Sequence, residues 1–164
     1  MDDHWERRVA AAWASLDDRE EAEFRALIGR LADELPADSG PASFERACAL
    51  DSTGHSDQAV PLYREALRLG LTGERRRRAV IQLSSSLRNL GHQQESIALL
   101  TTEMTAGSDH LDDAVRAVLA LCLTDVGRAR EAVSLLLTAL AAHLPRYQRS
   151  MANYARLLLE PEAP

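Results

Sequence analysis

The stretch LDSTGHSDQAVPLYREAL, residues 50–67, carries the pattern that decides the fold. Its glycine, Gly54, is followed five positions later by a small residue, Ala59, and then directly by an aliphatic residue, Val60. Four positions after the small residue stands a larger apolar side chain, Tyr63. Apolar residues at helical spacing on both sides of the glycine indicate two amphipathic helices joined by a short turn.

The same pattern occurs twice more, in LRNLGHQQESIALLTTEM (residues 87–104) and LTDVGRAREAVSLLLTAL (residues 123–140). The three glycines are spaced 37 and 36 residues apart. The equivalent residues in the second and third copies are Gly91 and Gly127, Ser96 and Ala132, Ile97 and Val133, and Leu100 and Leu136. A fixed period of this size is typical of helical-hairpin repeats, in which each pair of helices is stable only when it stacks on its neighbours. The general job of such an array is to present a surface.

Helical periods alternate with short turns from residue 42 to residue 159. The expected helices are about 42–53, 56–69, 74–90, 93–106, 110–126, 129–142 and 147–159. Alternating β-branched or aromatic runs, which would indicate strands, do not occur. The sequence therefore predicts an all-α fold with more than about 65% helix, against roughly 30–35% in an average globular protein. Gly91 is expected to end its helix with a positive φ, because a residue without a Cβ adopts that conformation without a clash.

Residues 1–40 lack the repeat and are expected to form a pair of helices packed onto the first hairpin. The first of these helices, about 4–16, has an apolar stripe, and Asp17 is expected to cap the second helix. The stripe consists of Trp5, Val9, Ala12, Trp13 and Leu16. Residues 1–40 also hold 11 acidic and 5 basic side chains, whereas the rest of the chain is neutral. We therefore expect two parts, residues 1–40 and residues 41–164.

Composition and charge exclude several classes of protein. No apolar run approaches the roughly 18–20 residues that cross a bilayer, so no membrane partner is expected. A net charge of −6 does not favour nucleic-acid binding. The first six residues are acidic where a signal peptide is basic, which makes the cytoplasm the expected compartment. Cys48 and Cys122 lie in apolar helical contexts without CxxC spacing and are expected to be free, buried thiols.

The first unit resembles the tetratricopeptide repeat (TPR), in which a glycine closes the first helix and alanines occupy the tight contact between the helices. The residues that carry the resemblance are Leu50, Gly54, Ala59, Val60, Tyr63, Ala66 and Leu67, with Leu119, Ala120, Leu123, Gly127, Ala132, Leu136, Ala139 and Leu140 in the third unit. The resemblance implies an α-solenoid, a right-handed superhelix of stacked hairpins. Its repeats would span about 41–73, 74–108 and 109–145, followed by a capping helix at 146–159. The stretch Ala42–Leu159 also looks like a bacterial group of short TPR proteins without an established activity.

Motifs that carry chemistry are missing from the sequence. It contains no Gly-rich phosphate loop, HExxH, GxSxG or paired CxxC. His55 and His92 follow two of the repeat glycines, but equivalent atoms in stacked units lie roughly 10 Å apart, the spacing of packed helices. Zinc ligands bind at about 2 Å, so one ion cannot be shared between them. We expect no enzyme, no metal and no cofactor.

Four consecutive arginines, Arg75 to Arg78, open the helix expected at 74–90. They can be a solvated first turn with intramolecular salt bridges. Alternatively, they can hold a phosphate, a carboxylate or the acidic N-terminal part of another copy. Adjacent helical residues point about 100° apart, so at most two of the four can face one ligand. The sequence leaves both interpretations open.

Polar stripes opposite the apolar faces of two helices form the candidate binding surface. On the helix 74–90 the stripe includes Arg78, Gln82 and Asn89, with Arg88 at its edge, and the capping helix repeats the arrangement with Arg149 and Asn153. The capping helix is expected to turn Tyr147, Met151, Tyr154, Ala155 and Leu158 inward. The resemblance implies that first helices line the concave surface, so these stripes are expected to face a groove.

The helix 110–126 is apolar nearly all round, which is typical of a buried helix. On a solenoid, its Val118 and Leu121 would instead form an apolar groove floor, a mark of an interaction site or an oligomer interface. The sequence thus predicts a non-catalytic scaffold or adaptor that binds a protein or peptide with an acidic or C-terminal carboxylate group. The alternative is a structural or regulatory homo-oligomer, such as a homodimer, that self-associates through this apolar groove.

Overall fold

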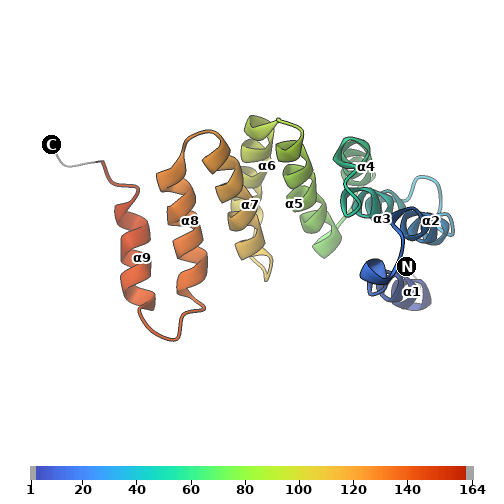
Figure 1. Cartoon of the computed structure of the whole chain (residues 1–164), viewed down its shortest axis with the longest axis horizontal. Coiled ribbons are helices and arrows are strands. Elements are labelled where there is room, and N and C mark those ends of the chain that lie inside the picture. Colours follow the sequence, from blue (N-terminus) through green and yellow to red (C-terminus); the bar gives the residue numbers. More distant parts are fainter. Residues whose placement is uncertain (1–2, 162–164) are drawn as a thin grey trace. The chain divides into compact units, whose positions relative to one another are not determined.

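The chain folds into two compact units, residues 1–86 (unit 1) and 87–164 (unit 2). The structure, a computed structural model, describes residues 3–161, so the ends of the two predicted parts, residues 1–2 and 162–164, lie outside it. The described residues form nine α-helices and one short 3-10 helix, without a strand (Figure 1). The α-helices are α1 (Asp3–Trp13), α2 (Glu21–Ala32), α3 (Gly40–Asp51), α4 (Ser56–Arg68), α5 (Gly73–Asn89), α6 (Gln93–Ala106), α7 (Asp112–Asp125), α8 (Ala129–Ala141) and α9 (Gln148–Leu157). The predicted all-α fold and its high helix content are confirmed.

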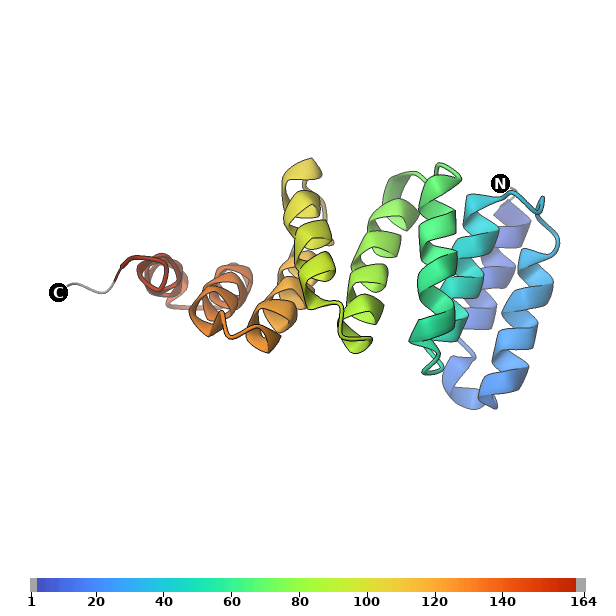
Figure 2. The same cartoon turned by 90° about the horizontal axis from the view of Figure 1, so that it is seen from above.

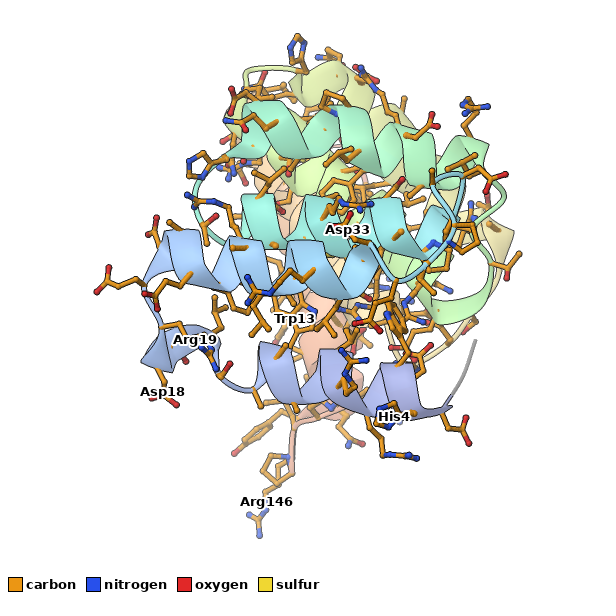
Figure 3. All side chains as sticks on the ribbon, turned by 90° about the vertical axis from the view of Figure 1, so that its right-hand side faces the viewer. His4, Trp13, Asp18, Arg19, Asp33 and Arg146 are labelled. Atoms are coloured by element: carbon orange, nitrogen blue, oxygen red, sulfur yellow. The ribbon has the colours of Figure 1, made fainter. Side chains whose placement is uncertain are left out.

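The N-terminal pair, α1 and α2, packs on α3 in unit 1. Its core contains Trp5 and Phe24 together with Ala49 of α3. Trp13 extends from α1 towards α2 (Figure 3), and its ring meets that of Phe24 edge-on at 5.0 Å. The indole Nε1 of Trp5 donates to the carbonyl of Leu31 at 2.8 Å, which ties the two helices together.

The predicted cap at Asp17 is wrong. Helix α1 ends at Trp13, and Asp17 lies in the 3-10 helix Leu16–Asp18, while Glu20 occupies the cap position of α2. The chain forms a 3-10 turn at this point, in which the Arg19 amide donates to the Leu16 carbonyl at 3.3 Å. Helix α2 therefore begins at Glu21, three residues beyond the position at which Asp17 could cap it.

Each repeat glycine ends a helix in the left-handed conformation. Gly54, Gly91 and Gly127 have φ values of 80°, 84° and 78°. The amide that follows each glycine donates back to a leucine carbonyl five residues earlier, as His92 does to Leu87 at 2.9 Å. This is the bond that closes a Schellman motif. The predicted turn at Gly91 is confirmed, and the period in the sequence is a period of helix ends.

Replacing Gly91 by alanine should therefore destabilise the protein by about 1–2 kcal/mol, the cost of a Cβ in the left-handed region. Gly29 is the matched control, because it lies inside α2 and an added Cβ would meet nothing within 4 Å. Gly29→Ala should stabilise the protein by about 0.5–1 kcal/mol through helix propensity. Urea unfolding measures both values, and equal effects of the two substitutions would contradict the assigned turn.

The three repeats bury their small residues equally but not their larger ones. Ala59, Ser96 and Ala132 are all buried. The larger residues are Tyr63 and Leu100, which are 0% exposed, and Leu136, which is 45% exposed. The aliphatic positions follow the same order, with Val60 and Ile97 buried and Val133 45% exposed. The third hairpin therefore has an apolar side that its counterparts keep covered.

Helix α9 lies beside α8 in unit 2 (Figures 1 and 2), and the Ser134 hydroxyl of α8 donates to the Ala155 carbonyl of α9 at 2.7 Å. The expectation that Tyr147 and Tyr154 turn inward is wrong, since they are 72% and 53% exposed. Of the expected inward set, only Ala155 is buried, while Met151 and Leu158 are half-buried. The contact with α8 includes Ala155, and the two rings lie outside it.

Both cysteines are buried and free, as predicted. Within residues 3–161, no helix combines the length and the apolar character that a membrane span requires.

Candidate functional site

Two of the predicted binding residues, Arg78 and Gln82, lie one turn apart on α5 and meet α3 within unit 1. The guanidinium carbon of Arg78 lies 5.3 Å from the centre of the Phe44 ring. The Cys48 thiol donates to the side-chain oxygen of Gln82 at 3.3 Å. Phe44 and Cys48 are themselves one turn apart on α3, so two successive turns of α5 contact two successive turns of α3. The structure thus brings these two predicted residues together on one surface.

Arg78 interacts with an aromatic ring rather than with a carboxylate. Its side chain is half-buried, and within the described chain it forms no ion pair; its recorded contact is the Phe44 ring. A guanidinium over an aromatic face is attracted to the ring while the donors at its edge stay unused. Burial by contrast raises the pKa of the neighbouring Cys48 thiol to about 12, so this cysteine stays protonated and unreactive.

An open hollow of about 420 Å³ adjoins Arg78. Pro41 and Leu71 line it with apolar groups, and Arg75 and Arg78 line it with positive charge. Glu6 and Glu74 also line it. The hollow is thus large enough for a few side chains and offers both an apolar wall and a cation.

Arg75 has a different role, because its charge is used within unit 1. Its guanidinium donates to both carboxylate oxygens of Glu6, at 2.8 and 2.6 Å, and to Glu45 at 3.1 Å. It also lies over the Trp5 ring, 5.5 Å from the centroid. The hydrogen bonds to Arg75 hold the pKa of the Glu6 carboxyl below its ordinary value of 4.5. For Arg75, the intramolecular interpretation of the arginine run is correct.

In unit 2, Arg88 is held by the Asp125 carboxylate, to which its Nε and Nη2 donate at 2.5 and 3.0 Å. These bonds raise the pKa of Arg88 above its usual range. The pair joins the end of α5 to the end of α7. Asn89, the last residue of α5, is exposed. Arg88 therefore has a structural partner, and only its remaining Nη1 is left for another group.

The other predicted residues of unit 2 lie on α7 and α9. Val118 of α7 is half-buried and Leu121 is 49% exposed, so Leu121 is a surface residue. Arg149 and Asn153 of α9 are exposed, and Asn153 accepts a hydrogen bond from Arg156 at 3.2 Å. Helix α8 lies between α7 and α9 (Figures 1 and 2), so the two sets occupy helices that are not neighbours.

The sequence interpretation missed two features of unit 1. Phe44 beneath Arg78 had no signal, because the two residues are distant in the sequence and the pairing depends on how α3 meets α5. Glu45 had no clear signal either, because it is one of three charged residues of α3, with Arg46 and Asp51. It is 3% exposed and accepts from the Trp13 indole at 2.8 Å as well as from Arg75.

A cavity of about 240 Å³ in unit 2 was also not predicted. Its apolar lining comes from Ile97 and Met104 of α6, Leu119 and Leu123 of α7, Leu135 of α8, and Leu159. These residues gather from three helices and the segment after α9, so no single helical stripe in the sequence marks the cavity.

The turn histidines do not form a site. His92 is exposed, and His55 is half-buried with its Nδ1 2.6 Å from the carbonyl oxygen of Thr53. Among residues 3–161, no group of three or more His, Cys, Asp or Glu side chains is placed to hold a metal ion.

Comparison with known proteins agrees with the helical-repeat fold. The family model described as Tetratrico peptide repeat matches residues 40–158. One similar solved structure is a variant of the nearly identical TPR-like repeats of a putative kinesin light chain from Podosopora anserina, with a TM-score of 0.70. The two chains are 18% identical over 97% of this chain and 94% of the other, a likeness that concerns the fold alone. No curated protein matches the chain. Because the family model matches the chain from α3 to α9, this chain belongs to the tetratricopeptide repeat family.

Proposed function

We propose that this protein is a non-catalytic scaffold or adaptor that binds a protein or peptide segment along the first helices of its hairpins, in the cytoplasm. The observation that supports this most is Arg78. It is a half-buried cation placed over an aromatic ring, beside a hollow, and it has no ion-pair partner in residues 3–161. A cation in this position fits a negatively charged group that arrives from outside.

The ligand group that matches Arg78 is a carboxylate, either an acidic side chain or a chain terminus. A guanidinium pairs with a carboxylate through two parallel, charge-assisted hydrogen bonds. Gln82, one turn further along α5, can donate its amide to the same segment. Pro41 and Leu71 would cover an apolar side chain next to the carboxylate. The pair is stronger in this semi-enclosed place than on open surface.

In unit 2 the proposed contacts are Arg88, Asn89, Val118, Leu121, Arg149 and Asn153. Leu121 would bury apolar ligand groups, as central anchors of interfaces do. Arg88 would act through its Nη1, because Asp125 occupies its other donors. A charge reversal at Arg88 would disturb the α5–α7 pair as well as any ligand contact, so Arg78 is the better position for a test.

The test uses an immobilised peptide library in which each sequence is present with a free C-terminal carboxylate and as its C-terminal amide, with and without acidic side chains. Wild-type protein should select peptides by a carboxylate, and Arg78→Gln should bind them at least about tenfold more weakly, since one charge-assisted pair is worth about 1.5–3 kcal/mol. The control is Arg30→Gln, an exposed arginine of α2, which should bind like wild type. Equal binding by wild type and Arg78→Gln, or equal binding of acids and amides, would remove this proposal.

A homo-oligomer remains the second candidate, and the half-exposed Leu121 favours it. It differs from the first candidate in a simple way, because an adaptor with a free groove can stay monomeric whereas a self-associating protein cannot.

A further inference from the structure

Two arginines of α5, Arg75 and Arg78, line the same hollow of unit 1. They are three residues apart, so they project from successive turns on one side of the helix. The guanidinium of Arg75 lies 5.5 Å from the centre of the Trp5 ring. That of Arg78 lies 5.3 Å from the centre of the Phe44 ring. Two guanidiniums that are each supported by a ring and face one hollow have the arrangement of a two-arginine anion site.

One half of this anion site is filled by the chain itself. The Nη1 and Nη2 atoms of Arg75 donate to the two carboxylate oxygens of Glu6, at 2.8 and 2.6 Å. The Nε atom of Arg75 donates to Glu45 at 3.1 Å, so each of its three nitrogens has an acceptor. Glu6 comes from α1 and lines the hollow. Its carboxylate therefore occupies the place at Arg75 that an external anion would need.

The other half of the anion site, at Arg78, can take one negative charge. Arg78 forms no ion pair in the part of the chain that the structure describes. The lining of the hollow already contains two carboxylates, those of Glu6 and Glu74, beside its two arginines. A ligand carboxylate at Arg78 adds a single negative charge, whereas a phosphate group adds about −1.5 to −2. The second charge of a phosphate would meet Glu6 instead of a cation, because Arg75 is already paired.

We propose that Glu6 determines the specificity of this site, and that it restricts the partner to one isolated carboxylate and rejects phosphate groups and runs of acidic residues. The inference rests on the proposed function of the surface at Arg78. Discrimination of this kind comes from an unfavourable charge placed against the wrong ligand, rather than from an added contact with the right one. Of the external ligands that the arginine run can hold, the carboxylate is thus selected and the phosphate is excluded.

Removing the charge of Glu6 should turn the hollow into a phosphate site. In Glu6→Gln, Arg75 would keep its bond to Glu45 and the Trp5 ring behind it, so its guanidinium would stay in place. Its Nη1 and Nη2 donors would face a neutral amide, which holds them less strongly than a carboxylate does. A phosphate could then displace the amide and bind both Arg75 and Arg78, because guanidiniums match the geometry of phosphate oxygens.

Peptide binding tests this directly. Library peptides that wild type selects are prepared in three forms. These have a single C-terminal carboxylate, a single internal glutamate with a C-terminal amide, or phosphoserine in place of that glutamate. Wild type should bind one or both carboxylate forms at least about tenfold more tightly than the phosphoserine form. Glu6→Gln should gain at least about tenfold in affinity for the phosphoserine form.

Two further variants separate the charge of Glu6 from its shape and from the general loss of an ion pair. Glu6→Asp keeps the charge and should keep the preference of wild type. Glu34→Gln is the matched control, because Glu34 also accepts two hydrogen bonds from one arginine, Arg8 of α1, at 2.7 and 2.5 Å. Glu34 does not line the hollow, so this variant should also bind like wild type. The circular dichroism spectra of all variants should match that of wild type.

Inorganic phosphate gives a second readout that needs no peptide. It should raise the unfolding midpoint of Glu6→Gln, relative to chloride at the same ionic strength, but not that of wild type or Glu34→Gln. An equal effect of phosphate on wild type and Glu6→Gln, or an affinity for phosphoserine that Glu6→Gln leaves unchanged, would overturn the role of Glu6 and leave the carboxylate site at Arg78 standing. A wild type that selects no carboxylate would instead remove the proposed function, and this inference with it.

Discussion

Arg75→Ala should lower the free energy of unfolding of unit 1 by about 3–5 kcal/mol, the largest effect that we expect from a single charged residue. The substitution leaves the Glu45 carboxylate, which is 3% exposed, with the Trp13 indole alone as a recorded partner. It also removes both hydrogen bonds to Glu6 and the stacking over Trp5. A buried carboxylate without its cation is costly, because water no longer solvates it. Urea unfolding followed by tryptophan fluorescence reports on this unit directly, since both tryptophans lie in it.

The matched control is Arg68→Ala. Arg68 also donates twice to one carboxylate, that of Glu65 at 2.7 and 2.6 Å, but this pair lies on the surface of α4. Its removal should leave the unfolding midpoint almost unchanged, because exposed pairs are screened by water and salt. Similar losses in Arg68→Ala and Arg75→Ala would show that Arg75 belongs to the surface as well.

The effect of Arg75→Ala should also depend on pH. The folded-state pKa of Glu6 lies below its ordinary value of 4.5, so its pairing with Arg75 contributes fully above pH 4.5. The contribution is lost as the pH falls through the folded-state pKa. The difference in stability between wild type and Arg75→Ala should therefore narrow below pH 4.5, and a difference that widens there would contradict the pairing.

Leu100→Ala should destabilise unit 2 by about 2–5 kcal/mol, whereas Leu136→Ala, at the equivalent position of the next repeat, should cost less than about 1 kcal/mol in the monomer. The two residues are the same in type and in place within the repeat. They differ in exposure, which is 0% for Leu100 and 45% for Leu136. Truncating the first leaves a cavity, and truncating the second mainly trims surface that water already reaches.

The comparison is made at protein concentrations below those at which the chain associates, so that dimer formation does not add to the stability of Leu136. Denaturant unfolding at several low concentrations gives both values. Equal losses at the two positions would mean that the third hairpin is covered like the others.

The fold was predictable because its signals are local. The turn at Gly91 requires a backbone conformation that glycine adopts without a clash. The close contact between two adjacent helices requires a small residue, which is Ser96 in this repeat. The regular spacing of the three glycines then predicts a row of stacked helical hairpins. The predicted cap at Asp17 is wrong because this residue lies in a 3-10 turn, and α2 begins only at Glu21.

The orientation of the last helix was less predictable for a different reason. The apolar stripe expected at 147–159 predicted an inward face for Tyr147 and Tyr154. In the structure, α9 contacts α8 through Ala155, Tyr154 lies outside that contact, and Tyr147 precedes the helix in the left-handed conformation, so both rings stay exposed. A stripe in the sequence shows that apolar residues share a side, but whether a neighbour covers that side depends on tertiary packing.

The candidate site was predictable in composition but not in pairing. The arginine and glutamine stripe of α5 was visible from its spacing, and two of its members lie together over α3. Whether an arginine has an ion-pair partner depended on distant residues, since Arg88 pairs with Asp125, while Arg78 lies over the Phe44 ring and forms no ion pair among residues 3–161. Those partners lie more than thirty positions away in the sequence, beyond the reach of periodicity.

The central claim is that a partner segment lies on the surface of α5 next to Arg78. A photo-crosslinking residue in place of Gln82, in cells of the organism that makes the protein, tests it most directly. The account predicts a covalent adduct to a protein segment with a nearby carboxylate, and loss of that adduct when Arg78 is also replaced by glutamine. A probe at Ala26, an exposed residue of α2 in the N-terminal helical pair, should give no such adduct. An adduct at position 82 that persists without Arg78, or the same adduct from position 26, would contradict the account.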